Sequence, residues 1–91
     1  MWRQTGINAL QDGIRKVFTF VESTDPQLED DMWTLNDNDK VYIQDASLYG
    51  GGYFVNAEVK DGFLEIGGFQ TLRAAMVACI DWNRDNSDMT A

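Results

Sequence analysis

The chain has 91 residues, a length that suits one domain with a modest core and is too short for two. Its 15 carboxylates against 7 lysines and arginines give a formal net charge of −8, which disfavours direct binding to nucleic acid or to anionic membranes. A hydrophobic fraction of 44% is typical of a folded chain and not of a disordered one.

The sequence also excludes several kinds of chemistry. The absence of histidine removes the usual general base, the serine–histidine and cysteine–histidine arrangements, and the commonest metal ligand. The single cysteine, Cys79, cannot form an internal disulfide, and we expect a buried thiol there and not a nucleophile. We therefore predict a protein that is not an enzyme and has no cofactor and no metal site.

The sequence predicts neither a membrane span nor a secretory signal. The longest apolar run is far shorter than a membrane span, and the N-terminus lacks the apolar core of a secretory signal. We expect a cytoplasmic protein.

Residues 1–22 allow two interpretations. Apolar residues recur at helical spacing and predict an N-terminal helix, through Ile7, Leu10, Ile14, Val17, Phe18 and Val21. In the other interpretation a short helix ends near Asp12, Gly13 stops it, and a strand covers residues 15–22, because Val-Phe-Thr-Phe-Val is rich in β-branched and aromatic residues. The choice after Gly13 stays open.

The next segment carries most of the charge. Between Glu22 and Asp45 there are eight carboxylates and one lysine, a local net charge of −7. The segment begins as a loop around the only proline, Pro26, and continues as two short strands at residues 32–35 and 40–44. Its Asp37-Asn38-Asp39 run departs from a calcium loop, which requires glycine at the sixth position. The three glycines at residues 50–52 lack the Lys-Ser/Thr of a phosphate loop.

Residues 53–66 predict a β-hairpin. Asp61-Gly62 between two alternating runs is a strong hairpin signal, and a two-residue loop there would place Lys60 opposite Phe63 and Glu58 opposite Glu65. One face would be wholly apolar, formed by Val55, Ala57, Val59, Leu64 and Ile66. The other face would be mixed, formed by Phe54, Asn56, Glu58, Lys60, Phe63 and Glu65. We expect Gly67-Gly68 to end the second strand.

A helix is predicted from about Thr71, its N-cap, to Arg84. Its apolar stripe would close the apolar face of the hairpin, through Leu72, Ala75, Met76, Cys79 and Ile80. Residues 85–91 are expected to be a frayed tail. The fold class is therefore α+β in a single domain, residues 1–91, with an antiparallel meander of about four strands packed on a C-terminal amphipathic helix and an N-terminal helix.

The leading functional hypothesis is a non-catalytic protein that presents carboxylates to a basic surface of a partner protein. Carboxylates would steer the encounter and aromatic side chains would anchor it. The proposed partner-binding residues are Asp30, Asp31, Trp33, Asp37, Asp39, Tyr42, Asp45 and Tyr49. If the basic surface binds nucleic acid, the carboxylates would stand in for phosphates and the protein would inhibit by occupancy.

In size, acidity and lack of catalytic residues the chain resembles small phage-encoded inhibitors of host defence, including anti-CRISPR proteins that act as DNA mimics. The resemblance is to a class through composition, without a motif, so it assigns no residue roles; it implies a host cytoplasm. The alternative is a structural or assembly module, either a homodimer or a subunit of a larger complex. Its contact would be the mixed hairpin face with Phe54 and Phe63, and the acidity would only confer solubility.

Overall fold

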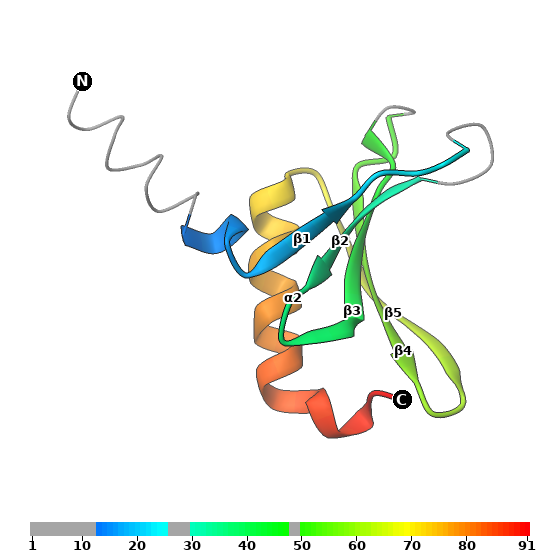
Figure 1. Cartoon of the computed structure of the whole chain (residues 1–91), viewed down its shortest axis with the longest axis vertical. Helices are drawn as coiled ribbons and strands as arrows, with labels where there is room; N and C mark the ends of the chain where they lie inside the picture. Colours follow the sequence, from blue (N-terminus) through cyan, green and yellow to red (C-terminus); the bar gives the residue numbers. More distant parts are fainter. Residues whose placement is uncertain (1–12, 26–29, 48–49) are drawn as a thin grey trace.

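The computed structural model describes residues 13–25, 30–47 and 50–91. Five strands form one antiparallel sheet in sequence order, and a long helix packs on one face of it (Figure 1). The strands are β1 (Phe18–Val21), β2 (Asp31–Leu35), β3 (Asn38–Asp45), β4 (Tyr53–Val59) and β5 (Gly62–Phe69). The helix is α2 (Leu72–Asn86), followed by the 3-10 helix η2 (Ser87–Met89). The predicted α+β meander is confirmed, with five strands instead of four.

The additional strand is β1, where the helical interpretation is wrong. Residues 13–15 form one helical turn, and the chain then enters β1, which pairs along its whole length with β2. Phe18 lies opposite Leu35, and both are buried, so pairing with a distant strand outweighs the helical spacing of the apolar residues. The rest of the predicted N-terminal helix, residues 1–12, lies outside the described residues.

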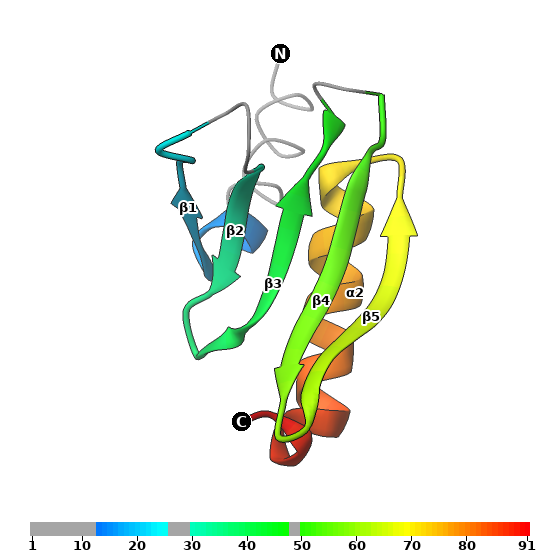
Figure 2. The same cartoon turned by 90° about the vertical axis from the view of Figure 1, so that its right-hand side faces the viewer.

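The strands β2 and β3 form a hairpin that is tighter than predicted. Its turn is Asn36-Asp37, because Leu35 pairs with Asn38, and the register shifts between Thr34 and Leu35. β3 runs through the middle of the sheet between β2 and β4 (Figure 2). Its central side chains Val41 and Ile43 have no exposed surface.

The hairpin of β4 and β5 has the predicted faces but not the predicted register. Its loop is Lys60-Asp61, and Gly62 already pairs with Val59 with a φ of 140°. Because the two-residue loop lies one position earlier in the chain, the β5 partner of each β4 residue in the predicted pairs shifts by two residues. Every side chain therefore keeps its face. Glu58 therefore lies opposite Phe63, and the predicted pair of Glu58 with Glu65 is wrong.

β5 also continues through the two glycines that were expected to end it. The strand reaches Phe69, which pairs with Tyr53, because a bulge between Val55 and Asn56 absorbs one extra residue of β5. Gly67 and Gly68 therefore lie inside a paired strand, opposite Val55 and Phe54.

Helix α2 begins and packs as its sequence predicts. Thr71 caps it, since the Ala74 amide donates to Thr71 Oγ1 at 3.1 Å. The helix buries Ala75, Met76 and Cys79 against the sheet, in a core that also contains Val41, Ile43, Val55 and Ala57. Burial of a side chain such as that of Met76 contributes roughly 1.5–3 kcal/mol before entropy is counted.

The predicted frayed tail is wrong. Residues 85 and 86 complete α2, η2 follows, and Thr90 forms a bridge with Val59. The Ala91 amide donates to the Glu58 carbonyl at 3.0 Å, and Asn38 Nδ2 donates to Thr90 Oγ1 at 3.1 Å. These partners are distant in the sequence, which is why the composition of the tail did not reveal them.

The face of the sheet away from α2, called here the outer face, is of mixed character. Alternation along the paired strands places on it Thr19, Val21, Met32, Thr34, Lys40, Tyr42, Gln44, Phe54, Asn56, Glu58, Phe63 and Glu65. Among the described residues, none of the helices has the length and apolarity that crossing a membrane requires.

Candidate functional site

Carboxylates gather at the end of the sheet where β2 begins and β3 ends. Asp31 and Asp45 are paired directly across these two strands, and Asp30 precedes Asp31 in the chain. Like charges directly opposite each other in a sheet are destabilising, so this pair is maintained at a cost in stability. We call Asp30, Asp31 and Asp45 the acidic end.

Neutral donors hold these three carboxylates in place. The Ser23 amide donates to Asp31 Oδ1 at 2.8 Å, and Gln44 Nε2 donates to Asp30 Oδ2 at 2.8 Å. The Ser47 amide donates to Asp45 Oδ1 at 3.0 Å, and the Ser47 hydroxyl donates to the same oxygen. These bonds orient the carboxylates without neutralising them.

The ion pairs among the described residues lie elsewhere. Lys40 Nζ is 3.7 Å from Glu58 Oε2, and Arg84 is 3.4 Å from both Asp81 and Asp85. The sequence contains no lysine or arginine between Lys16 and Lys40 or between Lys40 and Lys60, the two stretches that supply the acidic end. Among the residues that the structure describes, no lysine or arginine forms an ion pair with the acidic end.

Asp37 and Asp39 lie at the opposite end of the same hairpin. Asp37 is in the turn, Asp39 follows it, and both are exposed. The length of β2, from Asp31 to Leu35, separates them from Asp31, a distance of about 13 Å or more at about 3.3 Å per residue. The structure therefore divides the five predicted aspartates into two groups, because the turn of a hairpin and the free ends of its two strands lie at opposite ends of the hairpin.

The predicted aromatic anchors also separate. Trp33 lies on the face that carries the core, where its ring centroid is 4.8 Å from that of Phe20 and 5.7 Å from the Arg15 guanidinium carbon. Its Nε1 is buried and has no hydrogen-bond partner among the described residues. Tyr42 lies on the outer face, between Thr34 and Asn56. Tyr49 lies outside the described residues.

The surroundings of Tyr42 are anionic. Partial burial, and secondly the charge of Glu58, raise the pKa of Tyr42 above its ordinary value. Its hydroxyl is therefore a neutral hydrogen-bonding group at physiological pH. Such a ring can pack against a partner without presenting a charge to it.

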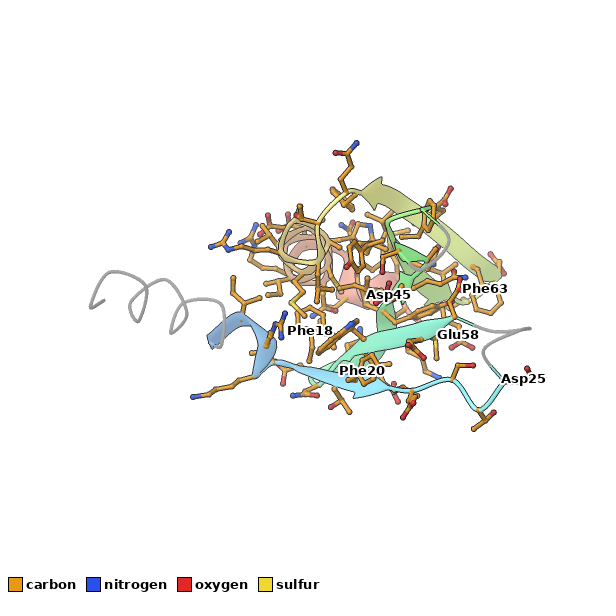
Figure 3. All side chains as sticks on the ribbon, turned by 90° about the horizontal axis from the view of Figure 1, so that it is seen from above. Phe18, Phe20, Asp25, Asp45, Glu58 and Phe63 are labelled. Atoms are coloured by element: carbon orange, nitrogen blue, oxygen red, sulfur yellow. The ribbon has the colours of Figure 1, made fainter. Side chains whose placement is uncertain are left out.

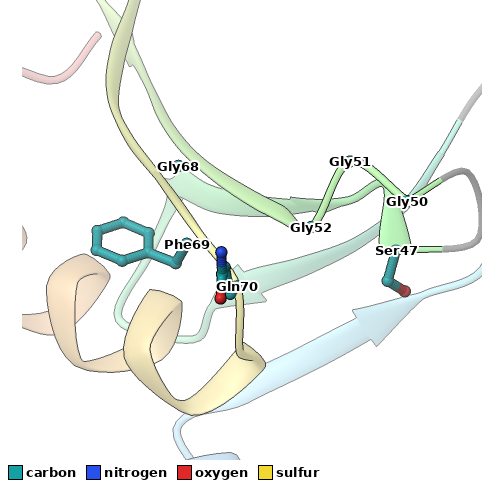
Figure 4. Close-up of a pocket in the computed structure, with 7 residues that line it drawn as sticks. All are labelled: Ser47, Gly50, Gly51, Gly52, Gly68, Phe69 and Gln70. Atoms are coloured by element: carbon teal, nitrogen blue, oxygen red, sulfur yellow. The ribbon is translucent and has the colours of Figure 1, made fainter.

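A hollow opens beside the acidic end. It has a volume of about 470 Å³ and is lined by Ser47, Gly50, Gly51, Gly52, Gly68, Phe69 and Gln70 (Figure 4). Gly50 and Gly52 have φ values of 78° and 80°, and a Cβ at Gly52 would lie 2.6 Å from the Phe69 carbonyl oxygen. The loop therefore requires glycine for its shape. Ser47, on the rim, is bound to the Asp45 carboxylate, which disfavours a phosphate in this hollow.

The described residues offer little for covalent or metal chemistry. Burial raises the pKa of the Cys79 thiol to about 12, so at neutral pH it is protonated and does not act as a nucleophile. No three or more cysteine or carboxylate side chains in this part of the chain are grouped so that they could hold a metal ion. The acidic end can act by charge and hydrogen bonding.

Two further carboxylates belong near the acidic end and were not among the predicted site residues. Glu22 and Asp25 flank Ser23, whose amide binds Asp31, and the Asp25 amide donates to the Ser23 hydroxyl at 3.1 Å. Seen from above, Asp25 lies at the edge of the molecule (Figure 3). The charge count of the segment includes both residues, but only the pairing of β1 with β2 shows their position.

In comparisons with models of protein families, with curated proteins and with solved structures, nothing matches this chain significantly.

Proposed function

We propose that this protein is a non-catalytic binding protein that engages a basic surface of a partner protein through its acidic end. The observation that carries the proposal is the Asp31–Asp45 pair. These two residues lie opposite each other, Asp30 lies next to Asp31, and neither member of the pair has a lysine or arginine as its sequence neighbour. A pair of opposed carboxylates costs stability in the free protein and gains a favourable contact when a lysine or arginine approaches.

The hollow beside Asp45 supports the same proposal. Its walls are largely backbone and glycine, so an extended side chain can enter without displacing a bulky group. Arginine and lysine combine a long apolar stem with a charged end. The stem suits contact with Phe69, and the charged end suits the side of Ser47, which binds the Asp45 carboxylate. Basic side chains of a partner are thus the ligand class that we assign to this end of the sheet.

The inhibitor form of the proposal follows when the basic partner surface is a nucleic-acid-binding site. The carboxylates then occupy positions that phosphates would take, and the protein acts in the cytoplasm, of a host cell if it is phage-encoded. Association would be accelerated by charge and weakened by salt, because the Debye length is about 10 Å at 0.1 M and only about 3 Å at 1 M.

Two charge-matched variants test the proposal. The first, D30N/D31N/D45N, neutralises the acidic end, and asparagine retains an oxygen for the Ser23, Gln44 and Ser47 donors. The second, D37N/D39N/D61N, neutralises exposed aspartates in or next to the two turns at the other end of the sheet. Each variant removes three of the 15 carboxylates, so the net charge changes equally from −8 to −5.

Binding is measured by fluorescence anisotropy with a labelled 20-residue peptide rich in arginine and lysine, at low and high salt. We expect the acidic-end variant to bind at least about tenfold more weakly at low salt, which corresponds to about 1.4 kcal/mol, and the control variant to change much less. Equal weakening by both variants would show attraction by net charge alone and would refute a localised site. Unchanged binding by the acidic-end variant would refute the proposal outright.

The inhibitor form requires a second measurement. Proteins captured from a cell extract on the immobilised chain should be released by added duplex DNA and retained poorly by the acidic-end variant. Circular dichroism and urea unfolding of each variant verify that the fold is intact. A captured partner that binds equally well with DNA present would refute the nucleic-acid mimicry while leaving the acidic contact in place.

A further inference from the structure

The strand β5 forms one open edge of the sheet (Figure 2). It has eight residues, and its hydrogen bonds within the described part of the chain come from β4 alone. Its side chains are unusually apolar for an edge, since Phe63 is 73% exposed and Leu64 is 38% exposed. Edge strands are commonly protected by lysine, proline or a short length, and β5 has none of these.

The backbone of β4 shows which groups of β5 point outward. The Glu58 carbonyl accepts a hydrogen bond from the Ala91 amide, on the side of β4 away from β5. Successive residues of a strand point their backbone groups to alternate sides, so the backbone groups of Ala57 point towards Leu64 of β5. The backbone groups of Phe63, the residue opposite Glu58, therefore do not bond to β4. The backbone groups of Phe63 and Glu65 therefore point to the open edge.

The small charge of β5 allows a second copy of this acidic chain to approach this edge. β5 carries a single charged residue, Glu65, whereas the other edge strand, β1, leads directly into the acidic loop that starts at Glu22. Four strand spacings of about 4.8 Å separate β5 from β1, so a two-fold axis at β5 keeps two such loops about 40 Å apart, well beyond the Debye length. A second copy of this chain can approach there with little repulsion.

We propose that β5 pairs antiparallel with β5 of a second copy, which joins the two five-stranded sheets into one. Pairing Phe63 with Glu65 of the second copy, and the reverse, gives two hydrogen-bonded residue pairs and places Leu64 beside Leu64 of the second copy on the two-fold axis. The longer overlap that centres on Glu65 would set two carboxylates directly opposite each other, which is unfavourable. Phe63 and Glu65 both lie on the outer face, so Phe63 of each copy would cover the Glu65 side chain of the other.

Two lysine substitutions of matched exposure test the proposal. L64K places two like charges together at the axis, and V21K places the same charge on the β1 edge; the two replaced side chains are 38% and 39% exposed. In sedimentation velocity from about 5 to 500 µM, the wild type and V21K should shift towards the dimer with concentration, and L64K should stay monomeric. A third variant, F63K, should dimerise more tightly, because its lysine would face Glu65 of the second copy.

A cross-link keeps the test independent of the stability of L64K. Under oxidising conditions L64C should form a disulfide-linked dimer and V21C should not, and the native thiol of Cys79 is fully buried. A wild type that stays monomeric up to 500 µM would overturn the proposal, as would loss of the dimer in V21K, which would place the contact at β1. A heterologous strand from a basic partner bound at this edge would also overturn it, and L64K would then bind that partner less well.

Salt separates this proposal from the one for the acidic end. Dimerisation through β5 should strengthen as salt screens the net charge of −8, whereas binding of a basic peptide should weaken. Either result can fail without the other.

Discussion

The opposed carboxylates of Asp31 and Asp45 should repel each other and lower the stability of the free protein. Directly opposite residues of an antiparallel pair have Cβ atoms about 4.5–5.5 Å apart. Two unit charges at about 5 Å in water repel by about 0.8 kcal/mol, and salt reduces this value. We therefore expect a repulsion of about 0.5–1 kcal/mol between these two carboxylates at low salt.

A double-mutant cycle isolates this repulsion from other effects of each substitution. Asp31→Asn also weakens the bond from the Ser23 amide, because hydrogen bonds to charged groups are the stronger ones, and Asp45→Asn does the same for Ser47. Each single variant relieves the whole repulsion, and the double variant can relieve it only once. The double variant should therefore be less stable than the sum of the single effects, by about 0.5–1 kcal/mol.

The assay is urea unfolding at pH 7, in low salt and again in about 1 M salt, where the Debye length is about 3 Å and the coupling should shrink. A cycle that combines Asp31→Asn with Asp61→Asn, at opposite ends of the sheet, serves as the control and should be additive. A coupling of zero, of opposite sign, or unchanged by salt would refute the reasoning. It would also remove the stability cost on which the proposed function depends.

Three further predictions concern the scaffold. Ile43 has no exposed surface, so Ile43→Ala should lower the free energy of unfolding by about 2–5 kcal/mol and Ile43→Val by about 0.5–1.5 kcal/mol, measured by urea unfolding. Gly62 and Gly13 both have open space where a Cβ would lie, but only Gly62 has a positive φ, of 140°. Gly62→Ala should therefore destabilise by about 1–3 kcal/mol, whereas Gly13→Ala should stabilise by up to about 1 kcal/mol; equal effects in thermal melts would contradict the backbone argument. The pKa of Cys79 is about 12 in the folded protein and near 9.0 in an unfolded chain, so the native thiol should resist a disulfide reagent at pH 8 and react in urea. Because the folded pKa is the higher one, stability should fall as the pH rises from about 9 towards 12, and Cys79→Ala should show a smaller fall.

Local patterns predicted those elements whose partners are near in the sequence. The stripe of α2 and its Thr71 cap follow from helical spacing and from one side-chain hydrogen bond, and both are present. The faces of the hairpin were also correct, since they depend only on alternation. Its register was not, because Gly62 uses its positive φ at the first strand position and Lys60-Asp61 take the corner.

Features that depend on distant partners were left open or missed. β1 was ambiguous in the sequence, because Phe18 and Val21 fit a helix as well as a strand, and only pairing with β2 decides between them. Thr90 was assigned to a frayed tail, although Asn38 and Val59 hold it in place. The open choice at β1 and the error at Thr90 have the same origin, since the deciding contacts join residues that no local window contains together.

The candidate site shows the same division. Most of the net charge lies between Glu22 and Asp45 whatever the fold, because the order of the residues alone places it there. Strand pairing places Asp31 and Asp45 opposite each other and Asp37 and Asp39 at the far end, and it leaves β5 at the edge of the sheet that the described residues form. Periodicity and capping arise from the geometry of a few neighbouring residues, whereas the sharing of one end or edge depends on turn length and strand order.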